Sequence, residues 1–257
     1  MEPKQIDELF AQTLAGGYDD ELPWVAVRTL HGMGSHEVLD RAAKWCASDT
    51  PLQRARGADI LAQLGRTADH PGNTFPEECF SQVLTLLQTE KETLPVLAAV
   101  HALGHIGNPL ALPLVIKHRS HPHPDVRFAV ACTLGNFADD ARTVSTLLEL
   151  MQDADEDVRD WATFGLGVQG NFDSEEIRNA LCQRMSDPDK DVREEAMVSL
   201  ARRKDQRVLP LLLDELNQSE ISYRVKEAAE ALLGQDESAE NWTSEDYSLA
   251  LKNHFSG

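Results

Sequence analysis

Residues 157–167 read Asp157-Val158-Arg159-Asp160-Trp161-Ala162-Thr163-Phe164-Gly165-Leu166-Gly167, and this stretch decides the fold. Its Val, Ala and Leu recur at positions i, i+4 and i+8, which places them on one apolar stripe of a helix. Carboxylates at Asp155 and Asp157 suit the free N–H groups and the positive end of a helix start. Gly167 predicts an exit through a left-handed residue. The stretch therefore predicts a helix with an encoded beginning and end.

The same pattern recurs along the chain and closes each time with Leu-Gly or a related pair. The closing pairs are Met33-Gly34, Leu64-Gly65, Leu103-Gly104, Leu134-Gly135, Leu166-Gly167, Leu200-Ala201 and Leu233-Gly234. The intervals are 31 residues (33 to 64), 39 (64 to 103), 31 (103 to 134), 32 (134 to 166), 34 (166 to 200) and 33 (200 to 233). A period in this range is typical of stacked helical repeats.

A second helix is expected between successive copies. The segments 109–116, 143–150, 177–182 and 208–216 all carry apolar residues at helical spacing. Each repeat is therefore a helical hairpin, which cannot bury its apolar faces until neighbouring hairpins stack on it. We find no convincing alternating strand pattern, so the sequence predicts an all-α solenoid of about seven hairpins.

The pattern Asp-Val-Arg-x-x-Ala-x-x-x-Leu-Gly, followed by a helix such as 207–216, resembles the HEAT repeat. More narrowly, it is similar to the bacterial subgroup of phycobilin-lyase-like HEAT repeats. The resemblance is strong over residues 92–234 and weaker over 1–91. It implies a right-handed α-solenoid in which the Asp-Val-Arg helices line the concave face.

The resemblance also implies a structural ladder of Arg and Asp side chains that runs from repeat to repeat. Here the ladder would consist of Asp125, Arg127, Asp157, Arg159, Asp191 and Arg193, with Lys226 in the last copy. Val96 takes the Arg position in the third copy, so the ladder should be broken there.

The domain prediction is a single solenoid over residues 1–257. Residues 1–91 form divergent repeats with a loop at 66–75, where Pro, Gly and Asn cluster. Residues 92–234 form the regular repeats. Residues 235–257 form an acidic linker and a final helix, capped by Thr243 with Asp246 three residues on, which would cover the last apolar face.

Composition restricts the partners. The net charge is −19 and the sequence pI is about 4.8, whereas a nucleic-acid binder would normally present a basic face. The N-terminal segment does not resemble a signal peptide, and no apolar run approaches the ~18 residues of a membrane span. The four cysteines show no metal or redox spacing. We therefore expect a cytoplasmic bacterial protein whose partner is a basic protein.

No catalytic or cofactor motif is convincing. Gly165-Leu166-Gly167-Val168-Gln169-Gly170 matches the dinucleotide pattern G-x-G-x-x-G, but a helix ends there instead of beginning. His101 and His105 lie four apart on one helix face, yet no acidic ligand at a suitable spacing completes a tetrahedral site. The sequence thus predicts no metal and no cofactor, and we expect a protein that is not an enzyme.

Trp161 and Phe164 lie off the buried stripe, where most copies carry small residues. The predicted partner-binding set is Trp161, Phe164, Asp160, Glu194, Glu195, His101 and His105. The leading hypothesis is a non-enzymatic adaptor that binds a basic protein on an acidic concave face, with an immunity-type protein as one specific form. The alternative is a bilin-lyase-like protein that holds a small hydrophobic chromophore against the two aromatic rings. The oligomeric state is left open.

Overall fold

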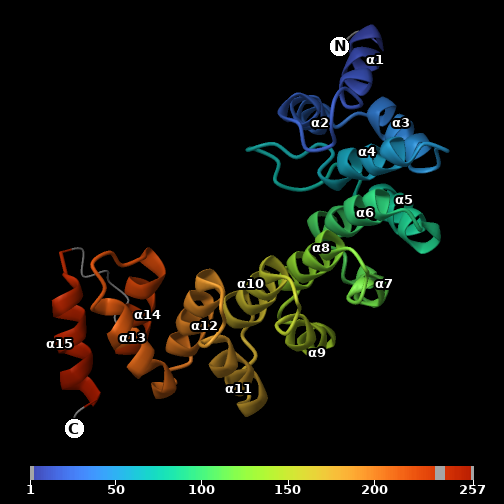
Figure 1. The fold of residues 1–257 in the computed structure, drawn as a ribbon. Helices are drawn as coiled ribbons and strands as arrows, with labels where there is room; N and C mark the ends of the chain where they lie inside the picture. Colours follow the sequence, from blue (N-terminus) through green and yellow to red (C-terminus); the bar gives the residue numbers. More distant parts are fainter. Residues whose placement is uncertain (1–2, 235–240, 256–257) are drawn as a thin grey trace. The chain divides into compact units, whose positions relative to one another are not determined.

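The computed structural model describes residues 3–234 and 241–255, and within them every regular element is helical. Fifteen α-helices are joined by short 3₁₀ and π-helical turns, and no strand occurs in these ranges (Figure 1). The prediction of an all-α fold built from helical hairpins is confirmed. Residues 235–240, predicted as an acidic linker, lie outside the described residues.

The chain divides into two compact units, residues 1–133 and 134–257, which are described separately. The division falls inside α8 (Pro124–Gly135), because this helix contributes residues to both units. The single solenoid over residues 1–257, with divergent repeats up to residue 91, stays a prediction.

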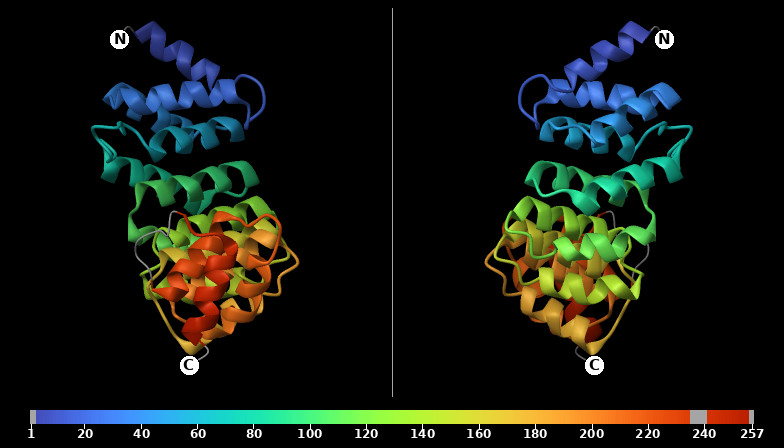
Figure 2. Two further views of the ribbon diagram at one scale, coloured as in Figure 1. Left: turned by 90° about the vertical axis from the view of Figure 1, so that its left-hand side faces the viewer. Right: turned by 90° about the vertical axis from the view of Figure 1, so that its right-hand side faces the viewer.

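The first unit stacks successive hairpins. Its helices are α1 (Pro3–Gln12), α2 (Glu21–Met33), α3 (His36–Cys46), α4 (Pro51–Ala62), α5 (Pro76–Thr89), α6 (Thr93–Ile106), the broken segment η1 (Pro109–Ala111), α7 (Leu112–Val115) and η2 (Ile116–His118), and most of α8. Helix α4 packs on α2, α3 and α6, so it lies at the centre of this unit (Figure 2). Residues 66–75 contain no helix, and the Thr74 N–H donates to the Leu64 carbonyl at 2.8 Å.

The second unit repeats the hairpin more regularly. Its helices are α9 (Ala141–Leu150), α10 (Glu156–Phe164), η3 (Gly165–Gln169), α11 (Glu175–Arg184), α12 (Lys190–Arg202), η4 (Gln206–Val208), α13 (Leu209–Leu216), α14 (Tyr223–Leu233) and α15 (Ser244–Phe255). Helix α12 packs on both α10 and α14, while α9, α11 and α13 each pack on the helix that follows them. The helices α10, α12 and α14 therefore form one continuous row.

Side-chain caps begin several of these helices, and those at Asp155 and Thr243 were expected from the sequence. Asp155 and Asp189 each accept a hydrogen bond from the backbone N–H three residues on, at 3.2 and 3.1 Å. Ahead of α15, Thr243 and Asp246 exchange hydrogen bonds in a reciprocal capping box. Helix α15 packs on α13 and α14 and buries Leu251 there.

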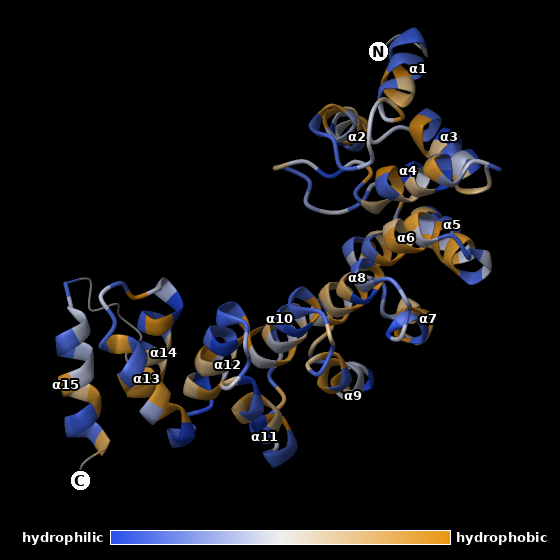
Figure 3. Ribbon diagram, viewed as in Figure 1, coloured by the Kyte–Doolittle hydropathy of each residue, from blue (hydrophilic) through white to orange (hydrophobic). Residues whose placement is uncertain are grey.

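The apolar stripe forms the core as predicted. Val158, Ala162 and Leu166 are fully buried, as are the equivalent Val and Leu residues of the copies that begin at 126 and 192. Helix α6 is apolar around most of its circumference, as its colour in Figure 3 shows, and eight of its residues are buried. A helix that is apolar on all sides needs neighbours on more than one face, which α4 and α5 supply.

The predicted role of Gly167 is wrong. Helix α10 continues into the π-helical turn η3, which the Gly170 N–H closes by donating to the Gly165 carbonyl at 3.0 Å. Gly167 is not among the glycines with positive φ. A Cβ atom there would lie 1.9 Å from the Ser199 hydroxyl oxygen, so this glycine allows α12 to approach closely. The left-handed exit occurs at other repeat ends, such as Gly34 and Gly234.

Candidate functional site

The two aromatic residues singled out by sequence lie on the α10–α12–α14 row of the second unit. Trp161 is 38% exposed and Phe164 is half-buried. Their ring centroids are 5.7 Å apart at 79°, an edge-to-face arrangement that is favourable for aromatic pairs. The stripe beneath them is already filled by Val158 and Ala162, and Trp161 presents part of its ring to solvent.

Four carboxylates lie near one another on the same row, and we call Asp160, Asp191, Glu195 and Glu227 the carboxylate cluster. Asp160 directly precedes Trp161 in the chain. Arg224, from the first turn of α14, donates to Asp191 at 3.1 Å, and its Nε lies 2.6 Å from the Glu195 carboxylate. Arg202 donates to Glu227 at 2.6 Å. In the described part of the chain, three of the four carboxylates, those of Asp191, Glu195 and Glu227, thus contact two arginines.

Two members of the cluster have raised pKa values. Burial raises the pKa of Glu195 to about 7, although Arg224 opposes the rise, and the neighbouring Asp160 and Glu227 add to it. Burial likewise raises the pKa of Asp160 to about 6. One Asp160 oxygen is buried without a hydrogen-bond partner among the described residues. The cluster therefore lacks enough positive charge to balance it, which would favour a cationic group from outside.

Glu194 and Glu195 were expected on the acidic surface, and the structure corrects this. They are only 3% and 4% exposed. Glu194 accepts a hydrogen bond from the Ser222 hydroxyl at 2.8 Å and thereby joins α12 to the N-cap of α14. Each copy packs between two neighbours, so these positions are covered by the next helix of the row. The more accessible carboxylates are those of Asp160, Asp191 and Glu227.

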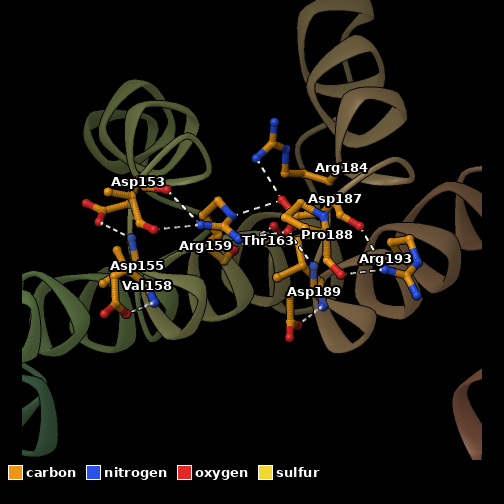
Figure 4. A network of polar contacts seen from close by, with 12 residues as sticks. Asp153, Asp155, Val158, Arg159, Thr163, Arg184, Asp187, Pro188, Asp189 and Arg193 are labelled. Carbon is orange, nitrogen blue, oxygen red and sulfur yellow. Dashed lines mark hydrogen bonds and ion pairs between the residues drawn. The ribbon is translucent and has the colours of Figure 1, made fainter.

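Arg159 lies at the centre of the expected ladder, and Figure 4 shows its contacts. Its Nε and Nη2 donate to the two carboxylate oxygens of Asp187 at 2.9 and 2.8 Å. Its Nη1 donates to the carbonyls of Asp153 and Ala154 at 2.9 and 3.1 Å. Burial alone would raise the pKa of Asp187, but the hydrogen bonds from Arg159 and from the Asp189 N–H hold it below its usual value. The residue therefore joins two successive repeats.

The acidic members of the ladder differ from the prediction. Arg159 pairs with Asp187, in the turn before the next copy, and not with Asp157 or Asp191. Asp157 is exposed, and Asp191 binds Arg224 instead. Asp125 lies beside His123, with 3.5 Å between carboxylate and ring nitrogen. The Asp of each motif stands in the first turn of its helix.

The arginines themselves share one structural task. Arg127 donates to the carbonyl of His121 at 2.9 Å, and Arg193 donates to that of Asp187 at 2.8 Å. Both carbonyls lie six residues before the arginine, as Asp153 does for Arg159. Each guanidinium therefore fastens the turn that enters its own helix, which explains why the motif repeats.

His101 and His105 lie elsewhere, in a pocket of the first unit of about 270 Å³. Helices α2, α4 and α6 and the turn at Tyr18 and Asp19 form its walls, and His31 from α2 also lines it. His105 is exposed and His101 is half-buried. Burial lowers the pKa of His101 to about 4 and also lowers the pKa values of His31 and His105.

Sequence reasoning missed a buried charge network beside this pocket. Arg56 is fully buried, and its Nε and Nη2 donate to the carbonyls of Thr13 and Tyr18 at 2.9 and 2.6 Å. Its Nη1 donates to Asp59 at 3.2 Å. Burial raises the pKa of Asp59 to about 6, against the opposing effect of Arg56. One signal was present: Arg56 lies eight residues before Leu64, where the copies that close at Leu134, Leu166, Leu200 and Leu233 place a buried Val.

Within the described residues, no helix has the length and apolar character to cross a membrane. The same ranges hold no group of three or more His, Cys, Asp or Glu side chains placed to bind a metal ion.

Comparison with known proteins places these features in a family. Protein YibA of Escherichia coli strain K12 is 27% identical over 214 residues, which span 79% of this chain and 72% of that protein. Its crystal structure superposes with a TM-score of 0.74 at 24% identity and covers 97% of this chain and 93% of that chain. At this identity the superposition shows a shared fold.

Two further solved structures are more distant. A designed armadillo repeat protein in complex with peptide (KR)4 has a TM-score of 0.52 at 15% identity, over 76% of this chain and 98% of that chain. The CpcE–CpcF complex of phycocyanin lyase from Nostoc sp. PCC7120 has a TM-score of 0.44 at 18% identity, over 91% and 83%. The latter likeness carries no argument about bilin chemistry.

The profile of the HEAT-repeat family matches residues 81–167 and 144–233, which together exceed half of the chain. The matched ranges contain the Asp-Val-Arg helices and the arginines that fasten their entry turns. The chain therefore belongs to the HEAT-repeat family.

Proposed function

We propose that this protein is a non-enzymatic HEAT-repeat adaptor that binds a basic segment of a partner protein on the α10–α12–α14 row. The observation that supports this most directly is the carboxylate cluster, with four carboxylates for two arginines, on the same row as the part-exposed Trp161. The narrower form of the proposal is an immunity-type protein whose partner is a basic toxin.

The physical argument rests on complementary charge and on an aromatic anchor. A basic segment would supply the positive charge that the cluster lacks, and the net charge of −19 would speed its approach. Trp161 offers a large apolar surface that loses little conformational freedom on binding, because Phe164 already contacts its ring.

The test is a titration with labelled (KR)4 peptide, followed by fluorescence anisotropy. Truncation of a central aromatic anchor costs about 2 kcal/mol, so Trp161→Ala should weaken binding at least about tenfold. Asp160→Asn combined with Glu227→Gln should weaken binding about threefold to tenfold at low salt and less at ~0.15 M salt, because screening reduces steering.

The matched control is Glu176→Gln. This residue is an exposed carboxylate in the first turn of α11, away from the row, so its loss changes the net charge without touching the cluster. Circular dichroism melts establish that each variant is folded. If Glu176→Gln weakens binding as much as the Asp160→Asn, Glu227→Gln double variant does, binding of the peptide depends on the net charge alone. The proposed surface is then wrong.

A further inference from the structure

The pocket of the first unit has a lining that differs in kind from the acidic row of the second. Among the described residues that line it are three histidines, His31, His101 and His105, and two aspartates, Asp19 and Asp59. The described lining holds no Lys or Arg. Trp24, Tyr18 and Leu97 supply apolar walls. The pocket is thus rich in hydrogen-bond acceptors and has no cationic donor.

The tautomer of His31 can be assigned from its hydrogen bond. Its Nε2 lies 2.8 Å from the Asp59 carbonyl oxygen, which can only accept, so Nε2 carries the hydrogen. Since burial lowers the pKa of His31, the ring is neutral near pH 7 and its Nδ1 keeps a free lone pair. The orientation of His31 is therefore fixed by the backbone of α4.

Unlike His31, the rings of His101 and His105 are not held by a hydrogen bond within the described part of the chain. Neither donates to nor accepts a hydrogen bond from any described residue, although the ring of His101 contacts Phe128 edge-on at 6.2 Å. Both are neutral near pH 7, because burial lowers their pKa values. The nitrogens of both rings are therefore open to a hydrogen-bond donor that enters the pocket.

The buried cation nearest this wall, Arg56, does not line the pocket. The Arg56 guanidinium carbon lies 4.3 Å from the centroid of the Tyr18 ring and 5.0 Å from that of Trp24. Its three nitrogens donate to Thr13, Tyr18 and Asp59. Tyr18 also donates its hydroxyl to Asp59 at 2.9 Å. Arg56 therefore holds the wall rigid and does not offer donors to a ligand.

We propose that this pocket binds a small organic cation, an ammonium or guanidinium group on a short apolar stem. The head group would donate to the imidazole nitrogens and to the carboxylates of Asp19 and Asp59, and the stem would lie against Leu97 and Trp24. An anion would meet two carboxylates and no cationic donor. The same head group occurs in free amines and guanidines and in Lys or Arg side chains of proteins, and the experiment separates the two sources.

The probes are n-butylguanidinium and N-acetyl-Gly-Arg-Gly-amide, each titrated by calorimetry and by ¹H–¹⁵N correlation spectra of the full chain. The matched neutral probes are n-butylurea and the corresponding citrulline peptide, which keep the shape and remove the charge. Binding of either cationic probe at least about tenfold more tightly than its neutral match supports the proposal. Tighter binding of the peptide identifies a protein side chain as the source, and tighter binding of n-butylguanidinium identifies a free small molecule.

The variants are His101→Leu, which removes an acceptor of the pocket, and His123→Leu, which removes an exposed histidine from the turn before α8. His101→Leu should weaken binding of the cationic probe about tenfold, whereas His123→Leu should leave it unchanged. Spectral changes should be confined to α2, α4, α6 and residues 18–19. The proposal is overturned if neutral and cationic probes bind alike, if neither binds, or if the changes fall on the α10–α12–α14 row.

Discussion

Each unit of this protein buries an arginine, but the two arginines hold different kinds of structure together. Arg56 in the first unit is fully buried and has two carbonyls, one carboxylate and two aromatic rings as partners. Arg159 in the second unit is 8% exposed and joins two carbonyls of its own entry turn to Asp187 of the next repeat.

The two arginines also occupy different positions of the repeat. Arg159 stands seven residues before its closing Leu166, next to the buried stripe, and its backbone contacts recur at Arg127 and Arg193. Arg56 stands eight residues before Leu64, on the stripe itself, where the last four copies have Val. Arg159 follows the repeat period and stabilises the contact between repeats. Arg56 departs from the period, and its network occurs in its own copy.

The largest expected effect is that of Arg56→Ala. It would leave the Asp59 carboxylate buried without its cation, and breaking a buried ion pair in this way costs about 3–5 kcal/mol. Urea unfolding followed by circular dichroism measures the loss. If this loss of unfolding free energy clearly exceeds that of Arg159→Ala, the buried network of the first unit contributes more stability than the contact between repeats in the second.

The double variant Arg56→Met with Asp59→Asn is the control for this first prediction. It removes both charges and keeps most of the volume, so it should recover part of the lost stability. Equal stabilities of wild type and Arg56→Ala would mean that the buried network does not stabilise the first unit.

Arg159→Ala should cost less, about 1–3 kcal/mol, because the acceptors it leaves behind are partly satisfied by others. Asp187 keeps a hydrogen bond from Arg184 at 3.0 Å and one from the Asp189 N–H at 3.1 Å. The measurement is again urea unfolding, with binding of (KR)4 per folded molecule expected to stay unchanged. Arg142→Ala, which removes an exposed pair with Asp140, is the matched control and should not alter the unfolding midpoint. An unaltered midpoint for Arg159→Ala would contradict its role between repeats.

The features of the second unit that follow the repeat period could be predicted from the sequence. The stripe of Val158, Ala162 and Leu166, the cap at Asp155 and the part-exposed Trp161 all follow from helical spacing, which is a local property. The pairing of Arg159 with Asp187 could not be read in the same way, because it depends on how far a side chain reaches between repeats.

The pocket network was harder to predict, since its members share no spacing. Thr13 and Tyr18 lie in the turn after α1, Trp24 in α2 and Arg56 in α4. Only the folded arrangement brings them together. The available clue was a charged residue at a stripe position, which conflicts with the local pattern. Such conflicts are expected where a chain builds a site.

The smallest effect concerns pH, and Glu195 of the second unit and His101 of the first should differ in its sign. Burial raises the pKa of Glu195 in the second unit to about 7. Between its unfolded pKa near 4.3 and this value, the folded state binds more protons than the unfolded state. The contribution of Glu195 to stability is therefore fully present below about pH 4.3 and is lost as the pH rises through about 7. Burial lowers the pKa of His101 in the first unit to about 4, so its contribution is present above about pH 6.5 and is lost as the pH falls through about 4.

Two variants isolate these contributions, because each removes one titrating group and leaves all the others in place. The difference in unfolding free energy between wild type and Glu195→Gln should shift against the wild type, by on the order of 1 kcal/mol, as the pH rises from 4.5 to 8. The difference between wild type and His101→Leu should shift in favour of the wild type over the same range. Urea unfolding at closely spaced pH values measures both slopes. Slopes of the same sign would mean that burial does not control these two groups in opposite directions, and the contrast between an acidic row and a neutral imidazole pocket would fail.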